Sequence, residues 1–137
     1  MLKNKILLAF LFTLFMGKSV VSKADFTKGL IAFINDNYET ALAEMMPLAE
    51  QGDAEAQHYL AIMYDFGKGL PENDKTAIEW YTKAAEQGHP NSQYILGIKY
   101  DNGEGVPEND KTAVKWFTKA AEQGNADAQT NLGYMYA

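Results

Sequence analysis

Residues 85–120 read AEQGHPNSQYILGIKYDNGEGVPENDKTAVKWFTKA, and residues 49–84 carry the same pattern one period of 36 residues earlier. About 22 of the 36 positions are identical in the two copies, and a third, partial copy runs over residues 121–137. Repetition at such a period is typical of a solenoid, in which no unit buries its apolar face alone. We therefore expect stacked repeats and an extended surface for partners.

Each copy has the apolar spacing of two consecutive helices. In the second half of a copy, Ala77, Trp80 and Ala84 fall on one face of a helix with a 3.6-residue period. The first half begins after a glycine with a capping residue, such as Asp53, and ends at another glycine, such as Gly67. The pattern predicts an all-α fold, an α/α solenoid of antiparallel helix pairs whose last repeat is incomplete.

Either Asn73 or Asp74 can cap the start of the helix that carries Ala77 and Trp80, because both side chains can accept a hydrogen bond from an N–H of its first turn. The spacing of Trp80 and Trp116 with alanines indicates core packing rather than carbohydrate stacking. Because Trp80 has repeats on both sides, we expect its loss to cost more stability than the loss of Trp116.

Residues 1–24 have the features of a secretory signal peptide. Lysines precede an apolar stretch from Ile6 to Met16, and small residues at Ser22 and Ala24 suit a cleavage site before Asp25. Cleavage after Ser22 and an uncleaved anchor are the alternatives, although the apolar stretch is short for a span. We expect a periplasmic or secreted repeat domain over residues 25–137, beginning with a degenerate unit at about 25–48.

The composition limits the classes of partner. The chain has 12 basic and 18 acidic residues and no cysteine, and every basic residue is lysine. Four lysines precede Asp25, so residues 25–137 hold 8 basic and 18 acidic residues, a net charge of −10. Such a charge disfavours nucleic acid and anionic lipid, so we expect no nucleic-acid partner and no stable membrane insertion after removal of the signal. A basic protein patch or a cell-wall amine is a better complement.

The repeat resembles the Sel-one-like repeat, a relative of the tetratricopeptide repeat, over roughly residues 38–137. The residues that carry the resemblance in the first full copy are Gln57, Leu60, Tyr64, Gly67, Gly69, Asp74, Ala77, Trp80 and Ala84, and most recur one period on. Ala61 stands where the pattern of this repeat has a glycine, as at Gly97 one period later. The resemblance implies an exported scaffold for protein–protein interaction. It also offers an alternative, a cell-wall-related hydrolase or penicillin-binding protein, although the cysteines of the penicillin-binding relatives are absent here.

The same resemblance places the first helix of each unit on a concave surface. The positions that vary between units on these helices are the candidates for binding a protein or peptide of unknown identity. They are His58, Ile62, Asp65, Tyr94, Ile98, Asp101, Thr130 and Tyr134.

No pattern of catalytic or metal-binding residues accompanies the repeats. His58 and His89 are replaced by other residues in the other copies, so we expect His58 on a solvent or groove face and His89 in a capping loop. The stretch from Asp101 to Gly105 lacks the oxygen ligands that a calcium loop needs. The sequence predicts no enzyme activity, no metal and no cofactor.

The third copy stops at Ala137, before the second helix that follows in the other copies. Apolar residues such as Leu132 and Tyr136 would then have an uncovered side, which favours association. We expect either further repeats in the natural protein or self-association through this end.

Overall fold

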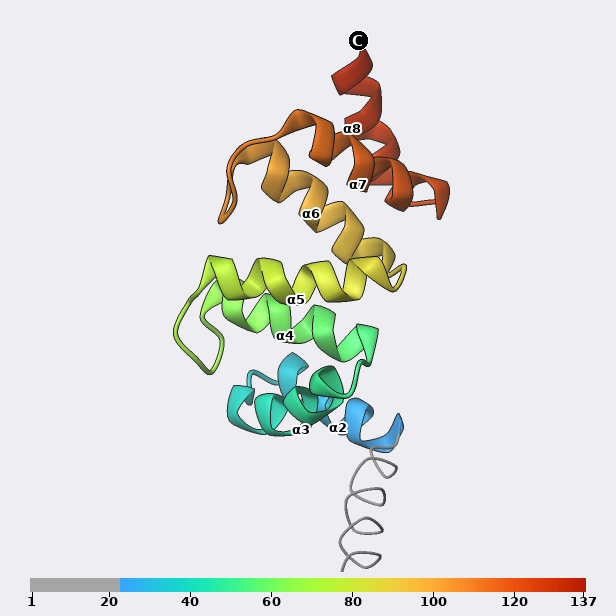
Figure 1. The fold of residues 1–137 in the computed structure, drawn as a ribbon. Coiled ribbons are helices and arrows are strands. Elements are labelled where there is room, and N and C mark those ends of the chain that lie inside the picture. Colours follow the sequence, from blue (N-terminus) through green and yellow to red (C-terminus); the bar gives the residue numbers. More distant parts are fainter. Residues whose placement is uncertain (1–22) are drawn as a thin grey trace, which may run out of the picture.

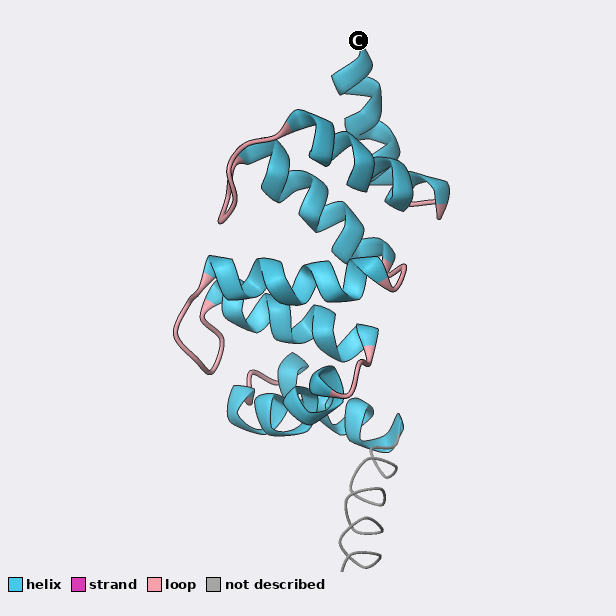
Figure 2. Ribbon diagram, viewed as in Figure 1, coloured by secondary structure: helices cyan, strands magenta, loops and turns pink. Residues whose placement is uncertain are grey.

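Seven helices and their connecting loops make up residues 23–137, which are the residues that this computed structural model describes. The predicted signal peptide therefore lies outside the described residues, apart from its last two positions. No strand occurs within 23–137, as Figure 2 shows. The helices in chain order are α2 (Lys23–Ile34), α3 (Tyr38–Glu50), α4 (Ala54–Phe66), α5 (Asp74–Glu86), α6 (Pro90–Asn102), α7 (Asp110–Glu122) and α8 (Ala126–Tyr136).

The helices begin and end where the local sequence predicts. The Asp53 carboxylate accepts a hydrogen bond from the Ala56 N–H at 2.8 Å, which caps the start of α4. Of the two candidate caps for α5, the structure uses Asn73, whose side chain accepts from the Thr76 N–H. Gly67 ends α4 with a φ of 61°, a left-handed conformation that glycine adopts without steric cost.

The helices stack in chain order as antiparallel pairs, so the molecule extends from α2 and α3 at one end to α8 at the other (Figure 1). Each described helix packs against its neighbours in the sequence, and α6 also contacts α8. The prediction of an all-α solenoid is confirmed.

Aromatic and aliphatic side chains of consecutive units pack together in clusters along the stack. A central cluster joins residues from α4, α5, α6 and α7, among them Ala61, Tyr81, Leu96 and Trp116. Trp116 is only 7% exposed, whereas Trp80 is half-buried between this cluster and the one around Leu60. Both tryptophans pack in the core as predicted. The expected order of their importance is not supported by burial, since Trp116 is the more enclosed.

Glutamine side chains link successive units. The Gln57 side-chain amide donates to the Ala49 carbonyl at 3.0 Å, and Gln87 donates to the Gln57 side-chain oxygen at 2.8 Å. Gln93 and Gln123 repeat the arrangement one unit later. Because buried polar groups are costly unless they are paired, these bonds fix how one helix pair sits on the next.

Helices α2 and α3 pack together at one end of the described stack. Phe26 and Phe33 of α2 lie with ring centroids 5.9 and 5.3 Å from Tyr59 of α4. Glu44 stands where later units have tryptophan, and it forms an ion pair with Lys28. A charged pair thus takes the place of the tryptophan, while Ile31 and Ile34 of α2 are 56% and 69% exposed at the same end.

Candidate functional site

The surface formed by the first helices contains a cleft between consecutive units. This first cleft has a volume of about 280 Å³ and brings together side chains from α4, α5, α6 and the loop that follows α6. Three predicted partner-binding residues, Ile62, Asp65 and Ile98, line it. The remaining lining residues are Phe66, Tyr81, Ile95, Lys99 and Glu104.

A charged network lies inside the first cleft. The Lys99 ammonium is 2.7 Å from an Asp65 carboxylate oxygen and 3.2 Å from the Glu104 carboxylate. The Tyr81 hydroxyl donates to the other Asp65 oxygen at 3.3 Å. Side chains of Asp65 and Lys99 are 5% and 13% exposed. Such enclosed charges are tolerated because each meets a partner of opposite charge or a hydrogen-bond donor.

The network shifts the ionisation of its members. Burial disfavours the Lys99 ammonium, but hydrogen bonds and attraction from Asp65 and Glu104 outweigh this effect and raise the pKa of Lys99. Burial, followed by the nearby charge of Asp65, raises the pKa of Tyr81. Lys99 therefore stays charged and Tyr81 stays neutral at physiological pH.

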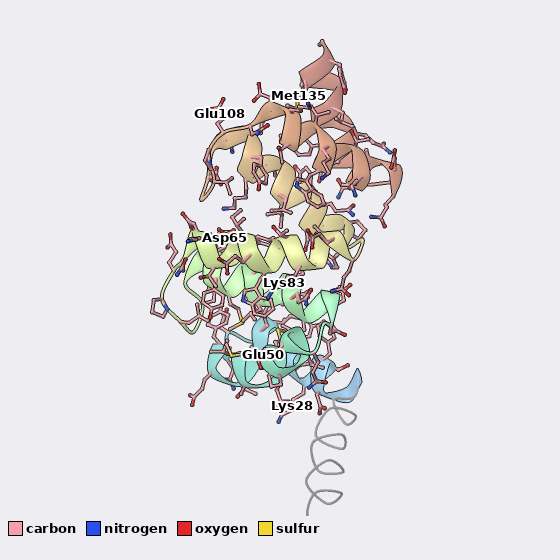
Figure 3. All side chains as sticks on the ribbon, in the orientation of Figure 1. Lys28, Glu50, Asp65, Lys83, Glu108 and Met135 are labelled. Atoms are coloured by element: carbon pink, nitrogen blue, oxygen red, sulfur yellow. The ribbon has the colours of Figure 1, made fainter. Side chains whose placement is uncertain are left out.

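A second cleft, of about 540 Å³, lies one unit further along the chain. It is lined by Asp101 of α6, Asp110, Lys111 and Val114 of α7, and Met135 of α8. Asp101 follows Asp65 by one period of 36 residues, and Met135 follows Lys99 by the same period. The two clefts therefore share two repeat positions in their linings, while their other lining residues and their chemistry differ. Met135 is labelled near the α8 end of the stack in Figure 3, and Asp65 is labelled further down.

The two histidines form a buried pair between α4 and α6. Their ring centroids are 4.4 Å apart and the rings are stacked. The His58 Nδ1 lies 2.8 Å from the Ser92 hydroxyl, while the His89 Nδ1 accepts the Ser92 N–H and caps α6. Burial, and secondly the proximity of His89, lowers the pKa of His58 to about 4.

The expected position of His58 on a solvent or groove face is wrong. The residue is 7% exposed because the start of α6 brings His89 and Ser92 against its ring. His89 does cap a helix, as expected, but its side chain is also buried. Within residues 23–137, no set of three or more His, Asp or Glu side chains is arranged to hold a metal ion.

The other predicted partner-binding residues differ in accessibility. Tyr94 packs against Phe117 with ring centroids 5.9 Å apart, so it contributes mainly to packing. Asp101 is half-buried and lines the second cleft. Thr130 and Tyr134 are exposed on α8, and neither is among the residues lining the two clefts.

Sequence reasoning missed Lys99 and Tyr81 as members of the site. Lys99 occupies a position where the units before and after have Met63 and Met135. A single charged residue at an otherwise apolar repeat position is a signal that could have identified it. Tyr81 carried a weaker signal, since its hydroxyl is the only difference from Phe117 one period later.

Among the described residues, no helix is both long enough and apolar enough to cross a membrane. Comparison of the sequence with curated proteins gives no match. Comparison of the structure does find relatives. A Sel1 repeat protein from Oxalobacter formigenes is 39% identical with a TM-score of 0.75, and the match covers 78% of this chain and 44% of that one.

Two further solved structures have the same arrangement of helices. A protective antigen of uropathogenic Escherichia coli strains, described as displaying an SLR fold, is 35% identical with a TM-score of 0.78, covering 82% of this chain and 25% of that one. The cysteine-rich protein B of Helicobacter pylori is 29% identical with a TM-score of 0.65, covering 67% and 69%. This chain therefore spans less than half the length of the first two.

The family model of the Sel1 repeat matches residues 54–89, 90–125 and 126–137, which together are more than half of the chain. These matches have the same 36-residue period as the copies in the sequence, and each begins with the first helix of a pair. The chain therefore belongs to the Sel1 repeat family.

Proposed function

We propose that this Sel1-repeat scaffold is exported and binds an extended protein or peptide segment along the surface formed by α4, α6 and α8. The observation that carries the proposal is the first cleft, which gathers Ile62, Asp65 and Ile98 from two consecutive first helices. A second cleft follows at the next unit. Clefts that recur with the repeat suit an extended ligand, because such a ligand can place successive side chains in successive clefts.

The first cleft has the chemistry of a pocket for an apolar side chain. Its walls include Ile62, Ile95 and Ile98, which are half-buried, and Phe66, which is 64% exposed. An aliphatic or aromatic side chain entering the cleft would remove this apolar surface from water, at about 25 cal/mol per Å². The charged groups that also line the cleft are already paired with one another, so they set its shape and leave the apolar walls to supply the affinity.

The basic start, apolar stretch and small-residue site in residues 1–24 support export to the periplasm or the medium. The net charge of −10 over residues 25–137 supports a basic partner. That α8 packs against further repeats or against a second copy stays a prediction, and the 77% and 75% exposure of Tyr134 and Tyr136 is consistent with both alternatives. The alternative role as a hydrolase or penicillin-binding protein has no comparable observation in its favour, so we propose only the scaffold role.

A displayed library of random peptides, selected against the purified protein, tests the proposal. We expect selected peptides to shift the NMR signals of residues around the first cleft and to lose at least tenfold in affinity for an Ile62→Glu variant. Ile31→Glu is the matched control, because Ile31 is 56% exposed on α2 and lines neither cleft. Equal loss in both variants, or shifts confined to another surface, would contradict the proposal. Circular dichroism of both variants verifies that they remain folded.

A further inference from the structure

We propose that the second cleft binds a lysine or arginine side chain of the partner segment, with the cation held by Asp101. This inference rests on the proposed scaffold function and specifies the chemistry of its partner. The evidence comes from comparing the two clefts, whose linings share two positions of the 36-residue repeat, that of Asp65 and Asp101 and that of Lys99 and Met135.

In the first cleft, the chain itself supplies the cation. Asp65 receives the Lys99 ammonium at 2.7 Å and the Tyr81 hydroxyl at 3.3 Å. This arrangement shows that a carboxylate at this position of the repeat accepts an ammonium coming from the next first helix. It also shows that the neighbouring helices leave enough room for the lysine stem.

In the second cleft, the carboxylate is kept and both donors are replaced. Asp101 follows Asp65 by one period, but Met135 stands in place of Lys99 and Phe117 in place of Tyr81. The structure shows no ion pair and no side-chain hydrogen bond of Asp101 within residues 23–137. A half-buried carboxylate without a cation is poorly stabilised. An incoming cation would form with Asp101 the ion pair that the Lys99 ammonium forms with Asp65.

The remaining lining residues fit a long basic side chain. Val114 and Met135 offer apolar contacts for the methylene stem, and Asp110 adds a second carboxylate at the start of α7. Lys111 is the opposing charge in the cleft, but it is exposed, so its ammonium can remain in water. Two carboxylates against one ammonium leave the cleft negative. Two carboxylates offer at most four of the six to eight oxygen ligands that calcium takes.

A pair of small probes tests the need for the cation. N-acetyl-lysine methylamide carries the ammonium, and N-acetyl-norleucine methylamide has a similar stem without it. In NMR titrations of the purified protein, we expect the lysine probe to cause saturable shifts at Asp101, Val114 and Met135, with a dissociation constant in about the millimolar range. The norleucine probe should cause none. Equal shifts with both probes, or the same shifts with calcium chloride alone, would overturn the inference.

Two variants test the residues. Asp101→Asn removes the charge at nearly constant volume and should abolish the shifts caused by the lysine probe. Met135→Lys should place an ammonium against Asp101 from within the chain, as Lys99 does for Asp65, and so raise the melting temperature and prevent probe binding. Met135→Leu is the matched control and should bind the probe normally. Unchanged binding by Asp101→Asn or by a folded Met135→Lys protein would refute the proposed site.

The peptides selected for the scaffold test separate the two proposals. We expect them to contain a lysine or arginine and to lose at least tenfold in affinity for Asp101→Asn. Peptides that bind the first cleft with no dependence on Asp101 would refute this inference and leave the scaffold function standing. A protein that binds the lysine probe at Asp101 but selects no peptide would refute the scaffold function instead.

Discussion

His58 should make the protein lose stability in mild acid. Its ring is 7% exposed, lies beside the Ser92 hydroxyl and is stacked on His89, which in turn faces the Glu55 carboxylate at 3.4 Å. The rings of Tyr59 and Tyr81 enclose the other sides. Among residues 23–137, no carboxylate forms an ion pair or hydrogen bond with His58, so protonation would place a charge in an enclosed position next to a second imidazole.

The magnitude follows from the pKa difference between the two states. Burial and His89 lower the pKa of His58 to about 4 in the folded protein, against 6.5 when it is exposed to water. As the pH falls below 6.5, the unfolded chain therefore binds the proton first. The contribution of His58 to stability is complete above this pH and is lost progressively toward pH 4. At about 1.36 kcal/mol per pKa unit, the loss is about 2.5 kcal/mol at pH 4.5 and about 3.4 kcal/mol in the acid limit.

Urea unfolding at pH 7.5 and at pH 4.5 measures this effect. Carboxylates also titrate in this range, so the decisive quantity is the difference between the wild type and a His58→Gln variant. We expect the variant to be less stable at pH 7.5 but to lose about 2.5 kcal/mol less on acidification. His89→Asn keeps a capping side chain, as Asn125 does one unit later, and should reduce the acid effect without removing it, because burial is its larger cause.

The reasoning fails if the wild type and His58→Gln lose the same free energy of unfolding between the two pH values. A ring titration of His58 followed by NMR gives an independent measurement. A His58 pKa near 6.5 in the folded protein would show that the side chain is not enclosed as the structure describes.

Three other predictions concern packing and export. Gly97→Ala would place a Cβ atom 2.4 Å from two ring atoms of Phe117, so overpacking should cost about 1–3 kcal/mol and outweigh the gain in helix propensity; an unchanged thermal midpoint would show that α6 and α7 are further apart. Trp116→Ala should cost about 3–5 kcal/mol and Trp80→Ala less, and the reverse order in chemical unfolding would contradict the burial pattern. Mass spectrometry of the exported protein should find an N-terminus at Asp25 or within a few residues, whereas an intact Met1 form confined to the cytoplasm would disprove export.

Part of the candidate site was visible in the sequence. The repeat identified the first helices, and the positions that vary between units included Ile62, Ile98 and Asp101, which do line the clefts. Variation between units did not separate these residues from His58, which is buried. The exposed fraction of a side chain depends on the side chains that the neighbouring helix pair places against it. Aligning the copies shows which positions are equivalent but not which residues of the next pair cover them.

The sequence by itself determined the helix pairs, their limits and their repetition, because each depends on residues only a few positions apart. Capping by Asp53 and the left-handed turn at Gly67 act within one turn of a helix. Tertiary structure alone decided which polar groups meet between units. Lys99 reaches Asp65 and His58 reaches Ser92 across 34 residues of sequence in each case. The angle and separation at which α4 and α6 stack set these contacts, and packing of the whole core fixes that geometry.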